Sequence, residues 1–112
     1  MSRTNWKQVE RDAAAHFGAL RYPANMGGPL DFGRTGLFVG QVKNTKVFSL
    51  AALERLAISM EDIGRGHDKP GVVVIKRSAG AGRETPMLVL MTMRTWDDIY
   101  RLLPEPFKEQ QT

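Results

Sequence analysis

The sequence contains no cysteine, so it can form neither a disulfide framework nor a metal site built on thiolates. No apolar run approaches the roughly 18–20 residues that a membrane-spanning helix requires, and the first residues lack the apolar core of a signal peptide. We therefore expect a cytoplasmic location, with neither secretion nor a membrane partner.

The sequence also lacks the motifs of a histidine-based site and of a phosphate-binding loop. The two histidines, His16 and His67, do not have the spacing of a metal site or a catalytic triad. The glycine cluster at 80–82 lacks the Lys-Ser ending of a P-loop, so it does not predict a nucleotide site. Both histidines are interpreted as ordinary surface residues.

What the chain does contain is typical of one globular domain. It has 112 residues, of which 42% are apolar and 25% are charged, which is enough for one modest core. We expect a single domain over residues 1–112, with residues 105–112 forming a frayed tail. The net charge of +4 and the pI of about 9.8 are compatible with a polyanionic partner.

Hydrophobic periodicity and capping signals divide the chain into helices and short strands. Three helices are predicted, at residues 5–17, 50–63 and 96–103; Ser49 and Thr95 are the predicted N-caps of the second and third, and Gly64 is expected to end the second. Strands are predicted at residues 19–21, 71–75 and 87–93, of which the last two are expected to be buried, and in the two arms of a hairpin at 30–43. The predicted fold class is α/β: a single domain of order α-β-β-β-α-β-β-α, with a central mixed sheet flanked by helices.

The first predicted helix carries an acid beside its apolar stripe. Trp6, Val9, Ala13 and Phe17 recur at intervals of three and four residues, which places them on one core-facing side. Glu10 lies on the flank of that stripe. It is either a functional acid held against the core or a solvated helix acid paired with a basic neighbour.

Residues 30–43 predict a β-hairpin in which two apolar arms flank a glycine-rich turn. Side chains alternate along a strand, so Gln41 and Lys43 lie on one face. A three-residue loop ending at Gly36 pairs Asp31 with Val39 and brings Asp31 to the same face. A two-residue loop would place Asp31 on the opposite face. The glycine at the third loop position favours the longer loop.

The hairpin and the first helix together supply the ligands of a metal site. Oxygen ligands from Glu10, Asp31 and Gln41, with Lys43 nearby, suit a hard divalent cation such as Mg²⁺ or Mn²⁺ acting on a phosphodiester. Lys43 would orient the attacking water or neutralise charge on the scissile phosphate. Burying these polar groups together is unfavourable unless a ligand uses them. The alternative is an exposed sheet face that carries ordinary polar residues.

These motifs resemble the PD-(D/E)XK nuclease superfamily and, within it, the archaeal-type Holliday junction resolvases. The resemblance covers about residues 6–100 in element order and rests on the segments 10–24, 29–32, 40–44 and 71–75. It implies a restriction endonuclease-like fold and a homodimeric, Mg²⁺-dependent hydrolase that nicks two strands of branched DNA in recombination. The family's metal-site residues and catalytic lysine match, in this sequence, Glu10, Asp31, Gln41 and Lys43.

Gln41 departs from the resolvase pattern, which has glutamate at this place. An amide oxygen can coordinate a cation but brings no charge, so metal affinity should be lower. Mrr-type restriction endonucleases resemble this chain in carrying glutamine here. The alternatives to a junction resolvase are therefore an Mrr-like or repair endonuclease on duplex DNA, and a non-catalytic DNA-binding module that kept the nuclease fold.

Basic residues outside the catalytic set are predicted to contact DNA phosphates, which makes binding weaken steeply with salt. We expect a nucleoid-associated protein, of a size that a virus or mobile element could encode. The predicted phosphate contacts are Arg3, Lys7, Arg11, Arg21, Arg34, Lys46, Lys76, Arg77 and Arg83.

The last third of the chain carries more large apolar residues than one short helix and two strands can bury. The remainder would form an exposed patch, and such patches mark interfaces. A homodimer is therefore predicted, since two related cuts call for two active sites. The alternative is that these residues complete the monomer core. They are Met87, Leu88, Leu90, Met91, Met93, Trp96, Ile99, Tyr100, Leu102, Leu103 and Phe107.

Overall fold

The computed structural model describes residues 6–23, 26–45, 49–78 and 83–105. Arg3, Lys46, Phe107, the glycine cluster at 80–82 and the tail from residue 106 onward lie outside these ranges. The predicted α/β domain with helices flanking a mixed sheet is confirmed. Its elements are α1 (Trp6–His16), β1 (Val39–Thr45), α2 (Leu50–Gly66), β2 (Gly71–Arg77), β3 (Met87–Leu90) and α3 (Met93–Arg101).

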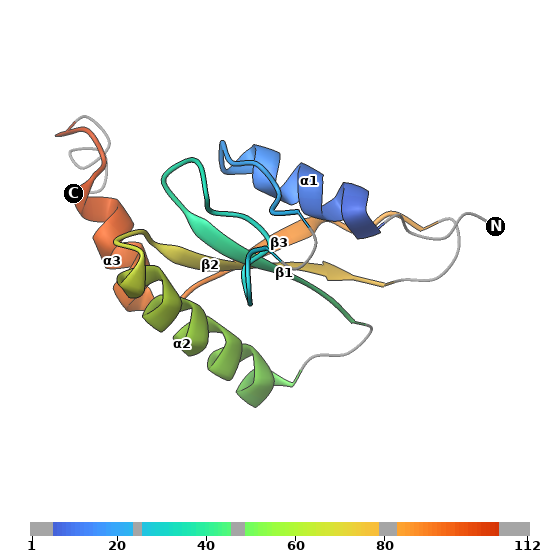
Figure 1. The fold of residues 1–112 in the computed structure, drawn as a ribbon. Helices are drawn as coiled ribbons and strands as arrows, with labels where there is room; N and C mark the ends of the chain where they lie inside the picture. Colours follow the sequence, from blue (N-terminus) through green and yellow to red (C-terminus); the bar gives the residue numbers. More distant parts are fainter. Residues whose placement is uncertain (1–5, 24–25, 46–48, 79–82, 106–112) are drawn as a thin grey trace.

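The sheet has the order β1-β2-β3, with β1 and β2 parallel and β2 and β3 antiparallel. The β1–β2 register runs from Val39 opposite Gly71 to Thr45 opposite Arg77. Helix α1 covers one face of the sheet and α2 covers the other (Figure 1). None of the described helices is long and apolar enough to cross a membrane.

Strand β2 is buried on both faces, as its continuous apolar run predicts. Val72 and Val74 pack with Ala13 and Ala14 of α1. Val73 and Ile75 pack on the opposite face, in the cluster that contains Met60 of α2. The strand therefore joins two small cores into one domain.

Two of the three strands predicted before residue 45 are wrong as regular strands. Residues 19–21 and the first hairpin arm reduce to isolated bridges, in which Phe32 pairs with both Arg21 and Gly40. The main-chain N–H groups of Asp31 and Phe32 both donate to the carbonyl of Gly40, at 2.9 and 3.3 Å. Two residues thus oppose one, as in a β-bulge, which interrupts the ladder after a single pair.

Helix α2 extends beyond its predicted end at Ile63. Its start is as predicted, with Ser49 Oγ accepting from the main-chain N–H of Ala52 at 3.0 Å. Gly64 was expected to end the helix but lies buried within it. A Cβ at Gly64 would collide with the main chain of Lys69 and Gly71. Gly64 therefore allows α2 to approach β2 closely, and it does not end the helix.

The C-terminal elements differ most from the prediction. Strand β3 ends at Leu90 instead of Met93, and Leu88 and Val89 are exposed rather than buried. Helix α3 begins at Met93, capped by Thr92, whose Oγ1 accepts from the N–H of Thr95 at 3.1 Å. The predicted cap, Thr95, instead lies buried inside α3. Thr92 and Thr95 are three residues apart, and Thr92 is the one that caps the helix. The Thr92 hydroxyl also bonds to Glu61 of α2.

Candidate functional site

Asp31 lies at the free edge of β1, held by main-chain contacts on both sides. Its carbonyl accepts from the N–H of Tyr22 at 2.8 Å. Its side-chain Oδ2 accepts from the N–H of Val42 at 2.7 Å. The carboxylate therefore occupies the place that a neighbouring strand's carbonyl would take.

The predicted pairing of Asp31 with Val39 is wrong. Phe32 pairs with Gly40 instead of Phe38, so the loop is two residues longer and covers residues 34–38. A shift of two residues keeps each side chain on its predicted face, so Asp31 still comes to the part of β1 that carries Gln41. The conclusion from the turn chemistry holds, but through a longer loop and a bulge.

Glu10 is buried on the inner side of α1, with 9% of its surface exposed. Its Oε1 accepts from Arg21 Nε at 2.6 Å, and the two side chains form an ion pair. The structure thus places Arg21, a predicted phosphate contact, against Glu10. Glu10 does not form the alternative pair with a basic neighbour on its own helix. Glu10 is held by Arg21, and the next residue, Tyr22, donates its main-chain N–H to the carbonyl of Asp31.

The carboxyl groups of Glu10 and Asp31 lie close enough to affect each other. Burial raises the pKa of Asp31 above its usual value of 3.8, and the hydrogen bond from Val42 opposes that rise. The charge of Glu10 and a side-chain hydrogen bond with it raise the pKa of Asp31 further, while the charge of Lys43 lowers it. Arg21 supplies a counter-charge to Glu10, whereas Asp31 has no ion pair of its own among the described residues.

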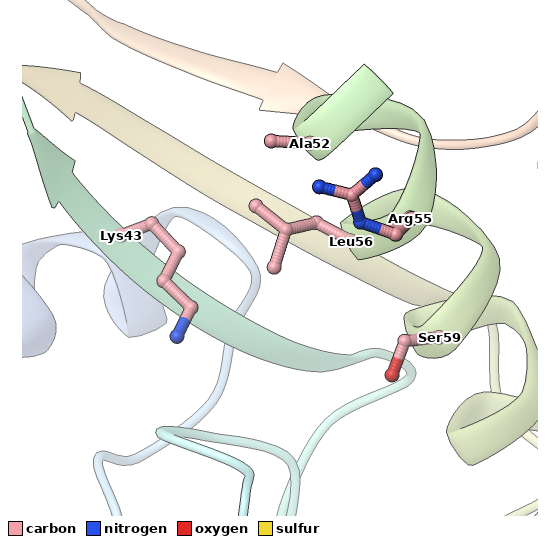
Figure 2. A pocket seen from close by; sticks show the side chains of 5 residues that line it. All are labelled: Lys43, Ala52, Arg55, Leu56 and Ser59. Atoms are coloured by element: carbon pink, nitrogen blue, oxygen red, sulfur yellow. The ribbon is translucent and has the colours of Figure 1, made fainter. Parts of the chain in front are cut away.

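Gln41 and Lys43 alternate along β1 with Val42, which faces the opposite core. The Nε2 of Gln41 donates to the carbonyl of Pro29 at 3.0 Å. Its amide is thus held beside the loop that leads to Asp31. Lys43 is half-buried and lines a pocket together with residues of α2 (Figure 2). The predicted shared face of these two residues is confirmed.

Of the predicted ligands, Glu10 and Asp31 meet at the edge of β1, whereas Gln41 lies on the face of β1 opposite the core that contains α1. In the described part of the chain, no group of three or more His, Cys, Asp or Glu side chains could hold a metal. The predicted set differs in kind, since it joins two carboxylates to an amide. Glu10 and Asp31 each bind a protein donor through one oxygen, and their carboxyl groups also contact each other. Hard divalent cations prefer such oxygens, and water completes their coordination.

The predicted phosphate contacts fall into two groups. Arg21 is paired with Glu10, and Lys76 donates to the carbonyl of Thr85 at 2.7 Å. The others within the described ranges lie exposed on the surface: Lys7, Arg11, Arg34, Arg77 and Arg83.

The sequence interpretation missed Arg55, which lines the same pocket as Lys43, with Leu56 between them (Figure 2). The signal was available in the β1-α2-β2 connection. A crossover helix starts near the C-terminal end of the strand before it and runs back over the sheet. A basic residue in its first turns therefore comes near the end of β1, where Lys43 lies.

No protein-family model, curated protein or solved structure matches this chain. Functional inference therefore depends on the residues of the site and on how the fold brings them together.

Proposed function

We propose that this chain is a metal-dependent, structure-selective DNA endonuclease of the type that it resembles, the Holliday junction resolvases, hydrolysing phosphodiesters in branched DNA. The observation that carries the proposal is the meeting of Glu10 and Asp31 at the edge of β1, next to Lys43. These side chains come from a helix, a bulge and a strand.

The chain's own residues would prepare the site in three ways. Arg21 holds one oxygen of Glu10, and Val42 holds one oxygen of Asp31, so both carboxylates keep a fixed orientation. Lys43 supplies a positive charge where the scissile phosphate accumulates negative charge. A Mg²⁺ or Mn²⁺ ion held by Glu10, Asp31 and Gln41 would supply Lewis acidity and an activated water.

The raised pKa of Asp31 supports a functional role for the acid pair. Acids whose pKa is raised by burial and by a neighbouring acid destabilise a protein that has no ligand bound. Such acids cluster at functional sites. A bound cation would relieve the repulsion between the two carboxyl groups. The same site would then be stabilised by the ion that it uses.

A non-catalytic DNA-binding module is the second candidate. Its support is the ion pair between Glu10 and Arg21, which already neutralises one acid, together with the uncharged Gln41. In that case Asp31 would serve only to complete the hydrogen bonding of β1. The two candidates make opposite predictions about strand cleavage.

A cleavage assay on labelled DNA separates them. Wild-type protein with Mg²⁺ or Mn²⁺ is expected to nick a four-way junction faster than a flap or a plain duplex. Lys43→Ala should lower the rate at saturating protein by at least about 100-fold, as expected for losing a group that stabilises transition-state charge. Lys7→Ala is the comparison, because it removes an exposed lysine that is predicted to contact a DNA phosphate: it should weaken binding but leave the rate at saturating protein unchanged.

Three outcomes decide the proposal. DNA binding without cleavage under either cation would favour the non-catalytic module. Equal rates on duplex and junction would favour an Mrr-like or repair endonuclease. Full activity of Lys43→Ala would remove the site assignment.

A further inference from the structure

A pocket opens between β1 and α2, beside the candidate site. Its volume is about 520 Å³, and it is lined by Lys43, Ala52, Arg55, Leu56 and Ser59. Figure 2 shows Lys43 extending from β1 on one side and Arg55 and Ser59 extending from α2 on the other. Leu56 lies between them and forms the apolar floor.

The lining of this pocket has two positive charges and no carboxylate. Within the described ranges, neither Lys43 nor Arg55 forms an ion pair. Two cations without a carboxylate in the lining favour an anion, although the charge of Lys43 also acts on Asp31 outside the pocket. The pocket therefore has the electrostatics of an anion site.

The chemistry of the lining indicates what kind of anion fits. The pocket is wide open to solvent, with a volume of about 520 Å³, so it can take part of an extended chain. The apolar surface of Leu56 and Ala52 suits the carbon atoms of a sugar. The guanidinium of Arg55 suits the two oxygens of a phosphodiester, which it can contact with paired N–H groups.

We infer that this pocket binds a second backbone phosphate of the DNA strand, adjacent to the phosphate at the candidate site, with its sugar against Leu56. Arg55 is the principal ligand, Lys43 contributes from the edge that it shares with Asp31, and the Ser59 hydroxyl is a further donor. The inference rests on the proposed function and deepens it, because it fixes how the strand passes between β1 and α2. Arg55 is thus a positioning residue.

Binding measurements without a divalent cation test the pocket apart from cleavage. Arg55→Gln keeps the length and polarity of the side chain and removes its charge. Arg65→Gln is the matched control, since Arg65 lies in the last turn of the same helix and outside the pocket. Arg55→Gln is expected to weaken binding of a four-way junction about 10-fold at low salt and to lower the salt slope by about 0.9. Arg65→Gln should do neither.

A set of junctions with one neutral methylphosphonate linkage each locates the contact. The linkage is placed in turn at the phosphates within a few nucleotides of the branch point. One position is expected to weaken wild-type binding about 10-fold and to have no further effect on Arg55→Gln. Every other position should affect both proteins equally.

Failure of this inference and failure of the proposed function can be told apart. Equal binding by Arg55→Gln and Arg65→Gln, or losses that add at every position, would overturn the pocket assignment while cleavage by wild type stands. Loss of cleavage in wild type, with the Arg55 coupling intact, would keep the pocket as a DNA site and reject the nuclease. Absence of any junction binding would overturn both.

Discussion

Asp31 is the residue on which most of the competing interactions act. Burial and Glu10 favour its neutral form, while the N–H of Val42 and the charge of Lys43 favour its carboxylate. The identity and spacing of these residues are visible in the sequence. Their balance is not, because it depends on a bulge that the hydrophobic pattern does not encode.

Asp31→Asn is expected to abolish cleavage and to stabilise the protein when no divalent cation is present. The amide oxygen can still accept from Val42, and the repulsion from Glu10 disappears. Because the folded-state pKa is raised above 3.8, the wild-type fold holds its proton more tightly than the unfolded chain does. Its contribution to stability is therefore full below that value and is lost as pH rises through the raised pKa.

Urea unfolding at several pH values, with and without Mg²⁺, measures this effect. The advantage of Asp31→Asn should grow as pH rises from about 4, and Mg²⁺ should stabilise only the wild type. Asp62→Asn, an exposed acid on α2, is the control. Equal stabilisation of wild type and Asp31→Asn by Mg²⁺ would show that Asp31 is not a ligand.

Gln41→Glu is expected to tighten Mg²⁺ binding and to destabilise the cation-free protein. A carboxylate restores the charge that the glutamine lacks, which favours the cation. It also removes the N–H donor to Pro29, a hydrogen bond worth about 1 kcal/mol. Isothermal calorimetry gives the affinity and urea unfolding the stability. Unchanged Mg²⁺ affinity in both Gln41→Glu and Gln41→Ala would exclude Gln41 from the site.

At the scale of elements, prediction succeeded where local signals agreed with packing. The stripe on α1, the Ser49 cap and the apolar run of β2 each have one interpretation, and the structure confirms all three. The Phe32–Gly40 pairing depends on contacts between segments that are distant in the sequence, such as the bridge between Arg21 and Phe32. The turn residues alone therefore predicted the wrong loop. The predicted position of Asp31 beside Gln41 does not depend on that error, because a shift of two residues leaves each side chain on the same face of the sheet.

Gly40→Ala is expected to destabilise the fold by about 1–3 kcal/mol, as overpacking does, and to lower cleavage in the surviving folded protein. A Cβ at Gly40 would overlap the ring of Phe32. Relief requires a shift of the bulge that holds Asp31. Thermal unfolding measures the first effect, and cleavage below the transition measures the second.

Gly66→Ala provides the control for this substitution. Its Cβ would meet nothing within 4 Å, and it lies in the last turn of α2. Its stability should be unchanged or higher by up to about 1 kcal/mol. Wild-type stability and activity in Gly40→Ala would mean that the bulge does not position Asp31.

At the scale of the whole molecule, charge and exposed apolar surface are the two properties that point to partners. The net charge of +4 belongs to a surface with exposed basic residues on α1, on β2 and in the 34–38 loop. Neutralising six to ten phosphates implies a loss of roughly 10³–10⁵ in DNA affinity between about 50 and 200 mM salt. Fluorescence anisotropy across that range measures it. A flat profile would contradict an electrostatic footprint.

The C-terminal apolar residues do not simply complete the monomer core. Leu88 and Val89 of β3 are 58% and 50% exposed, and Met93 and Trp96 of α3 are 72% and 41% exposed. Thr95 is the one buried residue of α3. The apolar side of α3, which stands at the end of the sheet beside α2, is therefore largely uncovered (Figure 1). Surfaces of this kind mark interfaces.

We expect a homodimer in which α3 lies at the interface, giving the two active sites that symmetric nicking requires. Light scattering at micromolar concentration should give twice the mass of 12.5 kDa. Trp96→Glu should give a folded monomer by scattering and circular dichroism, because a charge would then face the partner. Leu50→Glu is the control, since Leu50 is 83% exposed on α2, away from α3. A monomeric wild type that still resolves junctions would mean that its two cuts are made by sequential or transiently assembled subunits.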